Sequence, residues 1–165
     1  MSDGSGLPIG IQFRSWDGRK SCVRGSRLGL FIPKDIVFKQ EIVVTEGASD
    51  CAALLDLGFA VVGRPSCGAG IEHVIRLVQK YRIRSAVIAA DSDMPGLDGA
   101  YQLASRIAPF VSVARVFSPP PGVKDVRAWT QRGATRGDIE NAMELANDRA
   151  SGVVLVASGE GASRE

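Results

Sequence analysis

The sequence predicts an α/β fold, a parallel sheet flanked by helices, with a small β-rich extension before it. From Glu41 onward, short apolar runs alternate with stretches of helical periodicity, which is typical of βα units. Apolar residues recur three and four positions apart in those stretches, as on one face of a helix. The first forty residues lack this alternation, so we expect them to form a separate extension, residues 1–40.

The extension begins with a predicted hairpin. Ile11 and Phe13 lead into Trp16-Asp17-Gly18, and an Asp-Gly pair tolerates the positive φ of a tight turn. A second strand is expected over residues 20–24. Residues 25–33 have no regular period and predict a loop with one short extended piece.

The next hundred residues predict the sheet and its helices. The expected strands are residues 42–45, 59–62, 85–90 and 111–117, and the expected helices between them are 51–57, 71–78 and 100–107. The prolines of Ser118-Pro-Pro-Pro-Gly122 lack a backbone N–H, so this segment must leave the sheet as a loop. Two helices, 126–131 and 138–146, and a last strand, 153–156, complete a catalytic-type domain over residues 41–157. A Gly/Ser/Glu-rich tail, 158–165, is expected to be disordered.

Composition limits the possible functions. With 165 residues, 45% of them hydrophobic, the chain is long enough for one core. The net charge of +2 is too small to attract nucleic acid or anionic lipid in general, so a polyanion must be held locally. The apolar runs fall far short of the roughly 20 residues of a membrane span, and the start is polar. We therefore expect a cytoplasmic protein with no membrane partner.

Cysteine and histidine offer little chemistry. Cys22, Cys51 and Cys67 are odd in number and widely spaced, which suits neither a disulfide framework nor a zinc site. The single histidine, His73, lies in a predicted helix and excludes any site that needs several histidines. Metal or acid–base chemistry must therefore rest on carboxylates.

Acidic residues follow three of the predicted strands. Glu46 and Asp50 follow the first, Asp91 and Asp93 the third, and Asp125 comes after the prolines that follow the fourth. Ligands of open α/β sheets bind at this edge. Converging carboxylates repel one another unless cations lie between them, and hard oxygen ligands suit Mg²⁺ or Mn²⁺. The sequence predicts such a metal site, although Asp50 in a helical first turn and Asp125 as a helix cap also have structural explanations.

Two motifs carry a family resemblance. Thr45-Glu46-Gly47-Ala-Ser-Asp50 and Asp91-Ser-Asp93-Met-Pro-Gly96 resemble the Toprim domain, a Rossmann-like fold shared by bacterial primases, type IA and II topoisomerases, recombination-repair proteins and some nucleases. The similarity covers about residues 41–117. Residues 119–125, followed by Trp129, are similar to a segment after the Toprim core of primases. Residues 15–20 and 29–33 resemble the region before it in plasmid, phage and primase-like proteins.

The resemblance implies roles for the acids. Glu46 would be the general acid/base or a shared metal ligand, and Asp91 and Asp93 would hold Mg²⁺ against phosphate oxygens. Asp50 and Asp125 match acidic positions that complete the metal cluster of primases. Arg127 stands where primases usually carry a second acid, which weakens the case for a metal at Asp125.

The implied function is Mg²⁺-dependent nucleotidyl transfer in primer synthesis, performed as a piece or accessory of a larger primase. The implied partners are DNA or RNA, nucleotides, and a helicase or other replication modules. Arg64 and Lys124 are candidate nucleic-acid contacts.

Other functions remain open. A Toprim-type nuclease would use the same acids. In a nucleic-acid-binding module, the acids would be solvated loop residues and surface arginines would contact the phosphates. The candidate arginines are Arg14, Arg24, Arg27, Arg64 and Arg76.

Two alternatives start from the segment at Asp91. It resembles the phospho-acceptor segment of two-component receiver domains, with Asp91 as nucleophile, but the pair of adjacent acids and the lysine-proline pair of receivers are missing. An EF-hand loop fits Asp91, Asp93 and Gly96 but fails at Pro95 and Gln102.

Overall fold

The protein folds around one mixed sheet. The computed structural model describes residues 1–148 and 155–156, and within them the strand order is β4-β3-β5-β6-β7. The parallel strands are β3 (Glu41–Glu46), β4 (Val61–Arg64), β5 (Ser85–Ala89) and β6 (Val113–Phe117). The short strand β7 (Leu155–Val156) pairs antiparallel with β6. The predicted α/β class with a parallel sheet is confirmed.

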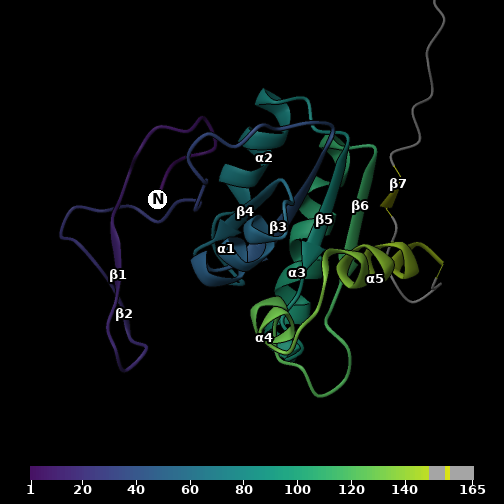
Figure 1. Ribbon diagram of the computed structural model, residues 1–165. Helices are drawn as coiled ribbons and strands as arrows, with labels where there is room; N and C mark the ends of the chain where they lie inside the picture. Colours follow the sequence, from purple (N-terminus) through teal and green to yellow (C-terminus); the bar gives the residue numbers. More distant parts are fainter. Residues whose placement is uncertain (149–154, 157–165) are drawn as a thin grey trace, which may run out of the picture.

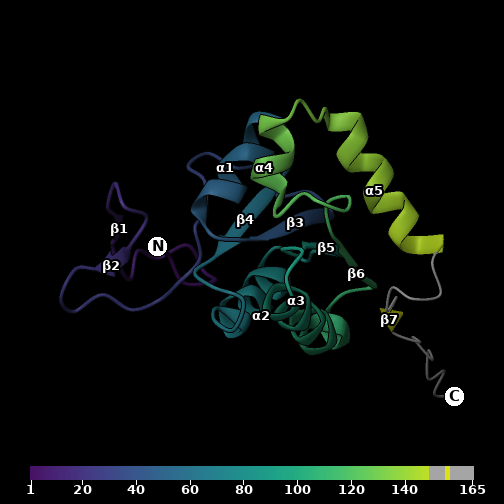
Figure 2. The same ribbon diagram turned by 90° about the horizontal axis from the view of Figure 1, so that it is seen from below.

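Helices cover both faces of the sheet. Figures 1 and 2 show α2 (Ile71–Lys80) and α3 (Met94–Ile107) on one face, and α1 (Ala48–Asp56), α4 (Val126–Gln131) and α5 (Arg136–Asp148) on the other. A single 3-10 turn, η1 (Ala108–Phe110), follows α3. The core accordingly forms two clusters, one on each face. Burial on both sides explains why residues 42–45 form a continuous buried run instead of an alternating one.

The second parallel strand begins later than predicted. Gly58, with φ of 83°, ends α1, and the backbone N–H of Phe59 donates to the carbonyl of Leu54. Phe59 is buried in the core as its apolar character indicates, but its backbone closes the helix, so β4 begins only at Val61.

Helix α3 begins six residues before the predicted start at Ala100. Asp93 caps it by accepting a hydrogen bond from the Gly96 N–H at 2.8 Å, and Pro95 occupies an early position where its missing N–H costs nothing. The prediction missed this turn because it followed apolar periodicity, which begins only further along the helix.

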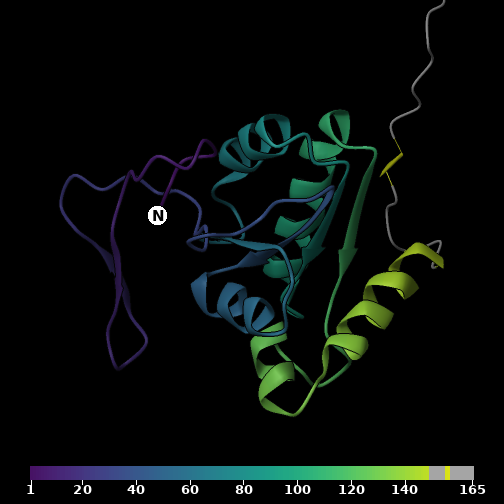
Figure 3. The ribbon, with the colours of Figure 1, turned by 45° about the horizontal axis from the view of Figure 1, so that its top comes forward.

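The extension forms the predicted hairpin, with a second strand shorter than predicted. Only β1 (Gln12–Arg14) and β2 (Lys20–Cys22) form a ladder, and Figures 1 and 3 show this hairpin projecting away from the sheet. Near the end of the extension, Phe31 exchanges two backbone hydrogen bonds with Gly63 of β4, at 2.8 and 2.9 Å. The ammonium of Lys80 on α2 donates to the Ser5 carbonyl at 2.6 Å. The extension thus attaches at the β4 edge and at α2.

The C-terminal predictions are described only in part. Strand β7 falls within the predicted strand 153–156, whereas residues 153–154 and the predicted tail, 158–165, lie outside the described residues. None of the helices found in residues 1–148 has the length and apolar character needed to cross a membrane.

Gly63 gives a test of the packing between β4 and the β3–α1 turn. A Cβ at this position would stand 2.4 Å from the Gly47 carbonyl oxygen, which belongs to a turn whose backbone is hydrogen-bonded to Arg64. Gly63→Ala should therefore lower the free energy of unfolding by about 1–3 kcal/mol, measured by urea denaturation. Gly68→Ala, where a Cβ meets nothing within 4 Å, is the matched control. Equal stability of the two variants would contradict this account.

Candidate functional site

The carboxyl ends of three parallel strands meet at one edge of the sheet and carry the predicted acids there. Strand β3 ends at Glu46, which lies in register with Arg64 of β4. Gly47 then turns the chain into α1 with φ of 89°, a conformation that favours glycine, and its N–H donates to the Arg64 carbonyl at 2.7 Å. Asp91 follows β5 after one residue. The turn and the register hold Glu46 at the sheet edge beside the neighbouring strand ends.

Asp91 lies at the electrostatic centre of the site. Burial is the largest cause of its raised pKa, and the negative charges of Glu46, Asp50, Asp125 and Asp93 follow in that order; together they raise the pKa of Asp91 from 3.8 to about 7. All four other predicted acids therefore act on this half-buried carboxyl group. The five carboxyl groups therefore lie close enough to interact electrostatically.

Asp50 links α1 to α4 through a hydrogen bond. It lies in the first turn of α1, is 7% exposed, and accepts from the backbone N–H of Arg127 at 3.2 Å. Burial, and then the charge of Asp125, raises the pKa of Asp50. Its structural role and its place in the acidic cluster coexist.

Asp93 and Asp125 each cap a helix with one oxygen. Oδ1 of Asp93 accepts from Gly96 at the start of α3, and Oδ1 of Asp125 accepts from the Ala128 N–H at 2.7 Å at the start of α4. The second oxygen of each has no hydrogen-bond partner within residues 1–148. Each side chain thus keeps one oxygen free to accept a further partner.

The proline loop is tied to the residue after Asp91. Ser92 donates its N–H to the Lys124 carbonyl and its Oγ–H to the Val123 carbonyl, both at 2.7 Å. This pair of bonds brings Asp125, distant in sequence, next to Asp91. The side chains of Lys124 and Arg127 remain exposed at the rim.

The structure corrects the assignment of Arg64 as a nucleic-acid contact. Arg64 is only 2% exposed, and its guanidinium donates to the carbonyls of Cys67 at 2.7 Å and Gly99 at 3.4 Å. Burial lowers the pKa of Arg64, and the charge of Glu46 opposes that shift. Arg64 is therefore an internal cation that joins the β4–α2 loop to α3, and it does not reach a ligand at the surface.

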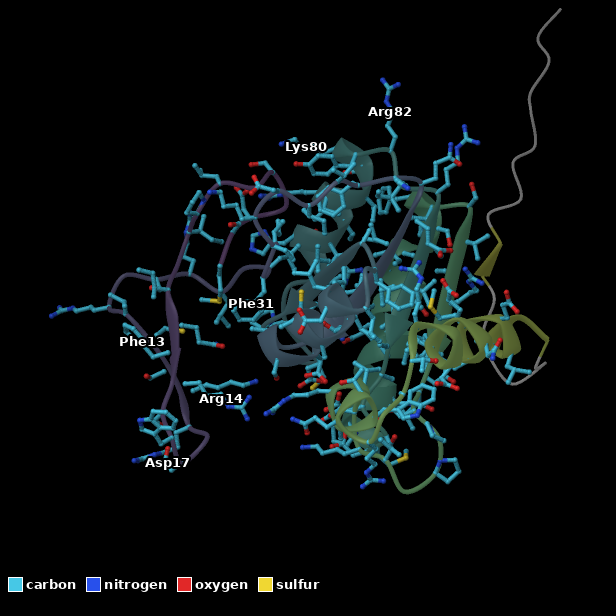
Figure 4. All side chains as sticks on the ribbon, viewed as in Figure 1. Phe13, Arg14, Asp17, Phe31, Lys80 and Arg82 are labelled. Atoms are coloured by element: carbon cyan, nitrogen blue, oxygen red, sulfur yellow. The ribbon has the colours of Figure 1, made fainter. Side chains whose placement is uncertain are left out.

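Lys20 is a site residue that sequence analysis missed. Its Nζ lies 3.9 Å from where a Cβ on Gly47 would stand, so the hairpin places an ammonium beside the acidic edge. Figure 4 shows Arg14, its partner in the β1–β2 ladder, pointing from the hairpin toward the helical body. The sequence carried no signal for this contact, because the hairpin's direction depends on how its base docks.

The donor chemistry fits Mg²⁺, although no cage is preformed. Among residues 1–148 and 155–156, no three His, Cys, Asp or Glu side chains stand in an arrangement that could hold a metal ion. Mg²⁺ usually keeps several waters and takes only one or two protein carboxylates together with substrate phosphates. Burial, and after it the repulsion from the other acids, raises the pKa of Asp91, and a bound cation would relieve that repulsion.

Comparisons with solved structures identify the fold. The DnaG primase catalytic domain bound to single-stranded DNA matches with a TM-score of 0.68 and 20% identity, over 88% of this chain and 50% of that one. A DNA primase domain from Pseudomonas aeruginosa gives 0.60 at 19% identity, over 88% and 49%. The zinc-binding and RNA polymerase domains of the Aquifex aeolicus primase give 0.64 at 15%, over 88% and 39%. The chain has a Toprim-like fold.

The Toprim-like chain spans about half the length, or less, of these three structures. No family model matches its sequence. No curated protein matches it either. The likeness is therefore one of fold.

The pKa of Asp91 predicts how stability depends on pH. The unfolded chain loses this proton near pH 4 and the folded protein near pH 7, so the contribution is complete below about pH 4 and is lost as pH rises to about 7. Because Asp91 is half exposed, solvent screening limits the loss to about 1–2 kcal/mol. Asp91→Asn should remove this loss of stability, measured by urea denaturation without metal between about pH 4 and 7. Asp98→Asn, an exposed carboxylate of α3, should follow the wild type, and a parallel curve for Asp91→Asn would refute the assignment.

Proposed function

We propose that this chain is the Mg²⁺-dependent Toprim domain of a primase-like protein and supports nucleotidyl transfer on nucleic acid. The observation that carries the proposal is the clustering of four acids around the half-buried Asp91 at the carboxyl edge of the parallel sheet. The Toprim-like fold supports it, since DnaG catalytic domains share that fold.

In this proposal Glu46 and Asp91 hold the metal, and the free oxygens of Asp93 and Asp125, together with the charge of Asp50, add to its negative surroundings. Bound Mg²⁺ would neutralise charge on the transferred phosphate. Glu46, exposed enough to meet a substrate, accepts or returns the proton of the attacking hydroxyl. Because Asp93 and Asp125 cap α3 and α4, their side chains stay fixed while a substrate enters.

We propose that the hairpin and the rim supply the contacts with nucleic acid. The hairpin and the turn after it carry one acid, Asp17, which is paired with Arg19, and several cations that form no salt bridge within residues 1–148. These cations are Arg14, Lys20, Arg24 and Arg27. Trp16 at the turn is fully exposed and offers a base-stacking surface. Lys124 at the rim remains a candidate contact, whereas the burial of Arg64 removes it from this surface.

Primer synthesis as a whole is proposed to need further modules. The matched primase structures are at least about twice as long as the part that this chain covers, and the Aquifex aeolicus structure comprises zinc-binding and RNA polymerase domains. The domain would contribute metal and phosphate chemistry to that larger machinery, alongside helicase or other replication partners.

Metal binding tests the acidic cluster. Asp91→Asn and Glu46→Gln should each weaken Mn²⁺ binding by at least about tenfold, equivalent to about 1.4 kcal/mol, because each removes a charged oxygen ligand. Electron paramagnetic resonance of free Mn²⁺ measures the affinity. Asp98→Asn serves as the control because it removes an equal charge from an exposed site on α3. Equal Mn²⁺ affinities in the wild type and all three variants would contradict the metal assignment.

Binding of a single strand tests the hairpin. Fluorescence anisotropy of a short labelled DNA strand with Mg²⁺ should show weak binding that falls with added salt. Arg14→Glu should weaken it by about fivefold or more, whereas Arg82→Glu, the same charge change just after the end of α2, should have little effect; Figure 4 shows the two residues on different parts of the molecule. Equal losses in both variants would mean that charge in general, and not the hairpin, governs binding.

A further inference from the structure

A cavity lies beside the acidic cluster without being part of it. Its volume is about 640 Å³, and its walls come from α3, the end of β6, the proline loop, α4 and α5. Ser92, the residue after Asp91, lines its border. The cavity therefore adjoins the edge at which the carboxylates meet.

The walls suit a flat aromatic ligand. Tyr101, Phe117 and Trp129 line the cavity, and the three prolines of residues 119–121 form a stiff apolar side. Ligand cavities typically measure about 300–1,000 Å³ and combine apolar walls with a few polar groups. Phe117 is buried, whereas Tyr101 and Trp129 are half-buried and keep part of their surface open.

Two polar side chains of α5 also line the cavity. Asp138 uses Oδ2 to accept from the N–H and Oγ–H of Thr135, at 2.8 and 2.6 Å, and its Oδ1 has no hydrogen-bond partner within residues 1–148. Those bonds lower the pKa of Asp138, so the group is a permanent acceptor. Asn141, one helical turn further on, is exposed and offers both an N–H donor and a carbonyl acceptor.

We propose that this cavity is a nucleobase subsite, in which the base of a nucleotide stacks on Trp129 and Tyr101 while its phosphates lie toward Asp91. The phosphate half of this arrangement rests on the proposed function, and the base half rests on the cavity alone. Because ionised Asp138 only accepts, it suits the exocyclic amino group of a base such as adenine, whereas both exocyclic groups of uracil are carbonyl acceptors and leave only its N3–H to donate.

Fluorescence of Trp129 provides a direct readout. The chain has two tryptophans, and Trp16→Phe leaves Trp129 as the only one. In that background, ATP with Mg²⁺ should quench the fluorescence saturably and bind at least about fivefold more tightly than inorganic tripolyphosphate, since stacking of a base contributes affinity that phosphates cannot. UTP should bind more weakly than ATP.

Variants separate the base from the phosphates. Tyr101→Ala removes one stacking surface, and Asn141→Ala removes a polar group from an exposed helical position where alanine favours the helix. Calorimetry should show weaker ATP binding in both variants and unchanged tripolyphosphate binding. Phe110→Ala, an exposed aromatic of η1 outside the cavity, should change neither.

The outcomes distinguish the two proposals. Equal affinity for ATP and tripolyphosphate, with no change in Trp129 fluorescence, would overturn the base subsite and leave the metal and phosphate site standing. An apolar dye that binds the cavity and is not displaced by ATP would also overturn it, in favour of an apolar partner. Loss of Mn²⁺-dependent tripolyphosphate binding in the wild type would instead contradict the proposed function.

Discussion

The structure depends on holding like charges close together at one edge of a sheet. Asp91 is half-buried among four other acids, and the pKa of its carboxyl group rises to about 7 as a result. Such an arrangement costs free energy and needs a rigid frame. The glycine turn at Gly47, the hydrogen bonds from Ser92 to the proline loop, and the bond from the Arg127 N–H to Asp50 supply that frame.

The same side chains serve the frame and the site. Asp93 and Asp125 cap α3 and α4 with one oxygen each, and Asp50 joins α1 to α4. The structural and functional explanations of these acids are therefore compatible. A carboxylate that caps a helix is fixed in orientation. Its second oxygen stays available, and a cluster that binds a cation requires both properties.

The acidic edge has different surroundings on its two sides. The hairpin brings Lys20 toward Gly47, and Figure 4 shows Arg14 directed the same way, while the aromatic cavity opens beyond Ser92. Cations on one side suit a phosphate backbone, and aromatic walls on the other suit a base. The proposed substrate, a nucleotide joined to a strand, has both parts.

The sequence by itself determined the parallel strands, the helices between them and the acids at their ends. Those features follow from local periodicity and from the rule that parallel strands end together. The sequence did not reveal that Arg64 is buried. An arginine at a strand end gives no local sign that the β4–α2 loop and α3 will cover it. Nor did the sequence place Lys20 at the acidic edge or form the cavity beside Trp129. These depend on how the extension and α5 dock, and docking is decided by contacts between segments far apart in the chain, such as the bonds between Phe31 and Gly63.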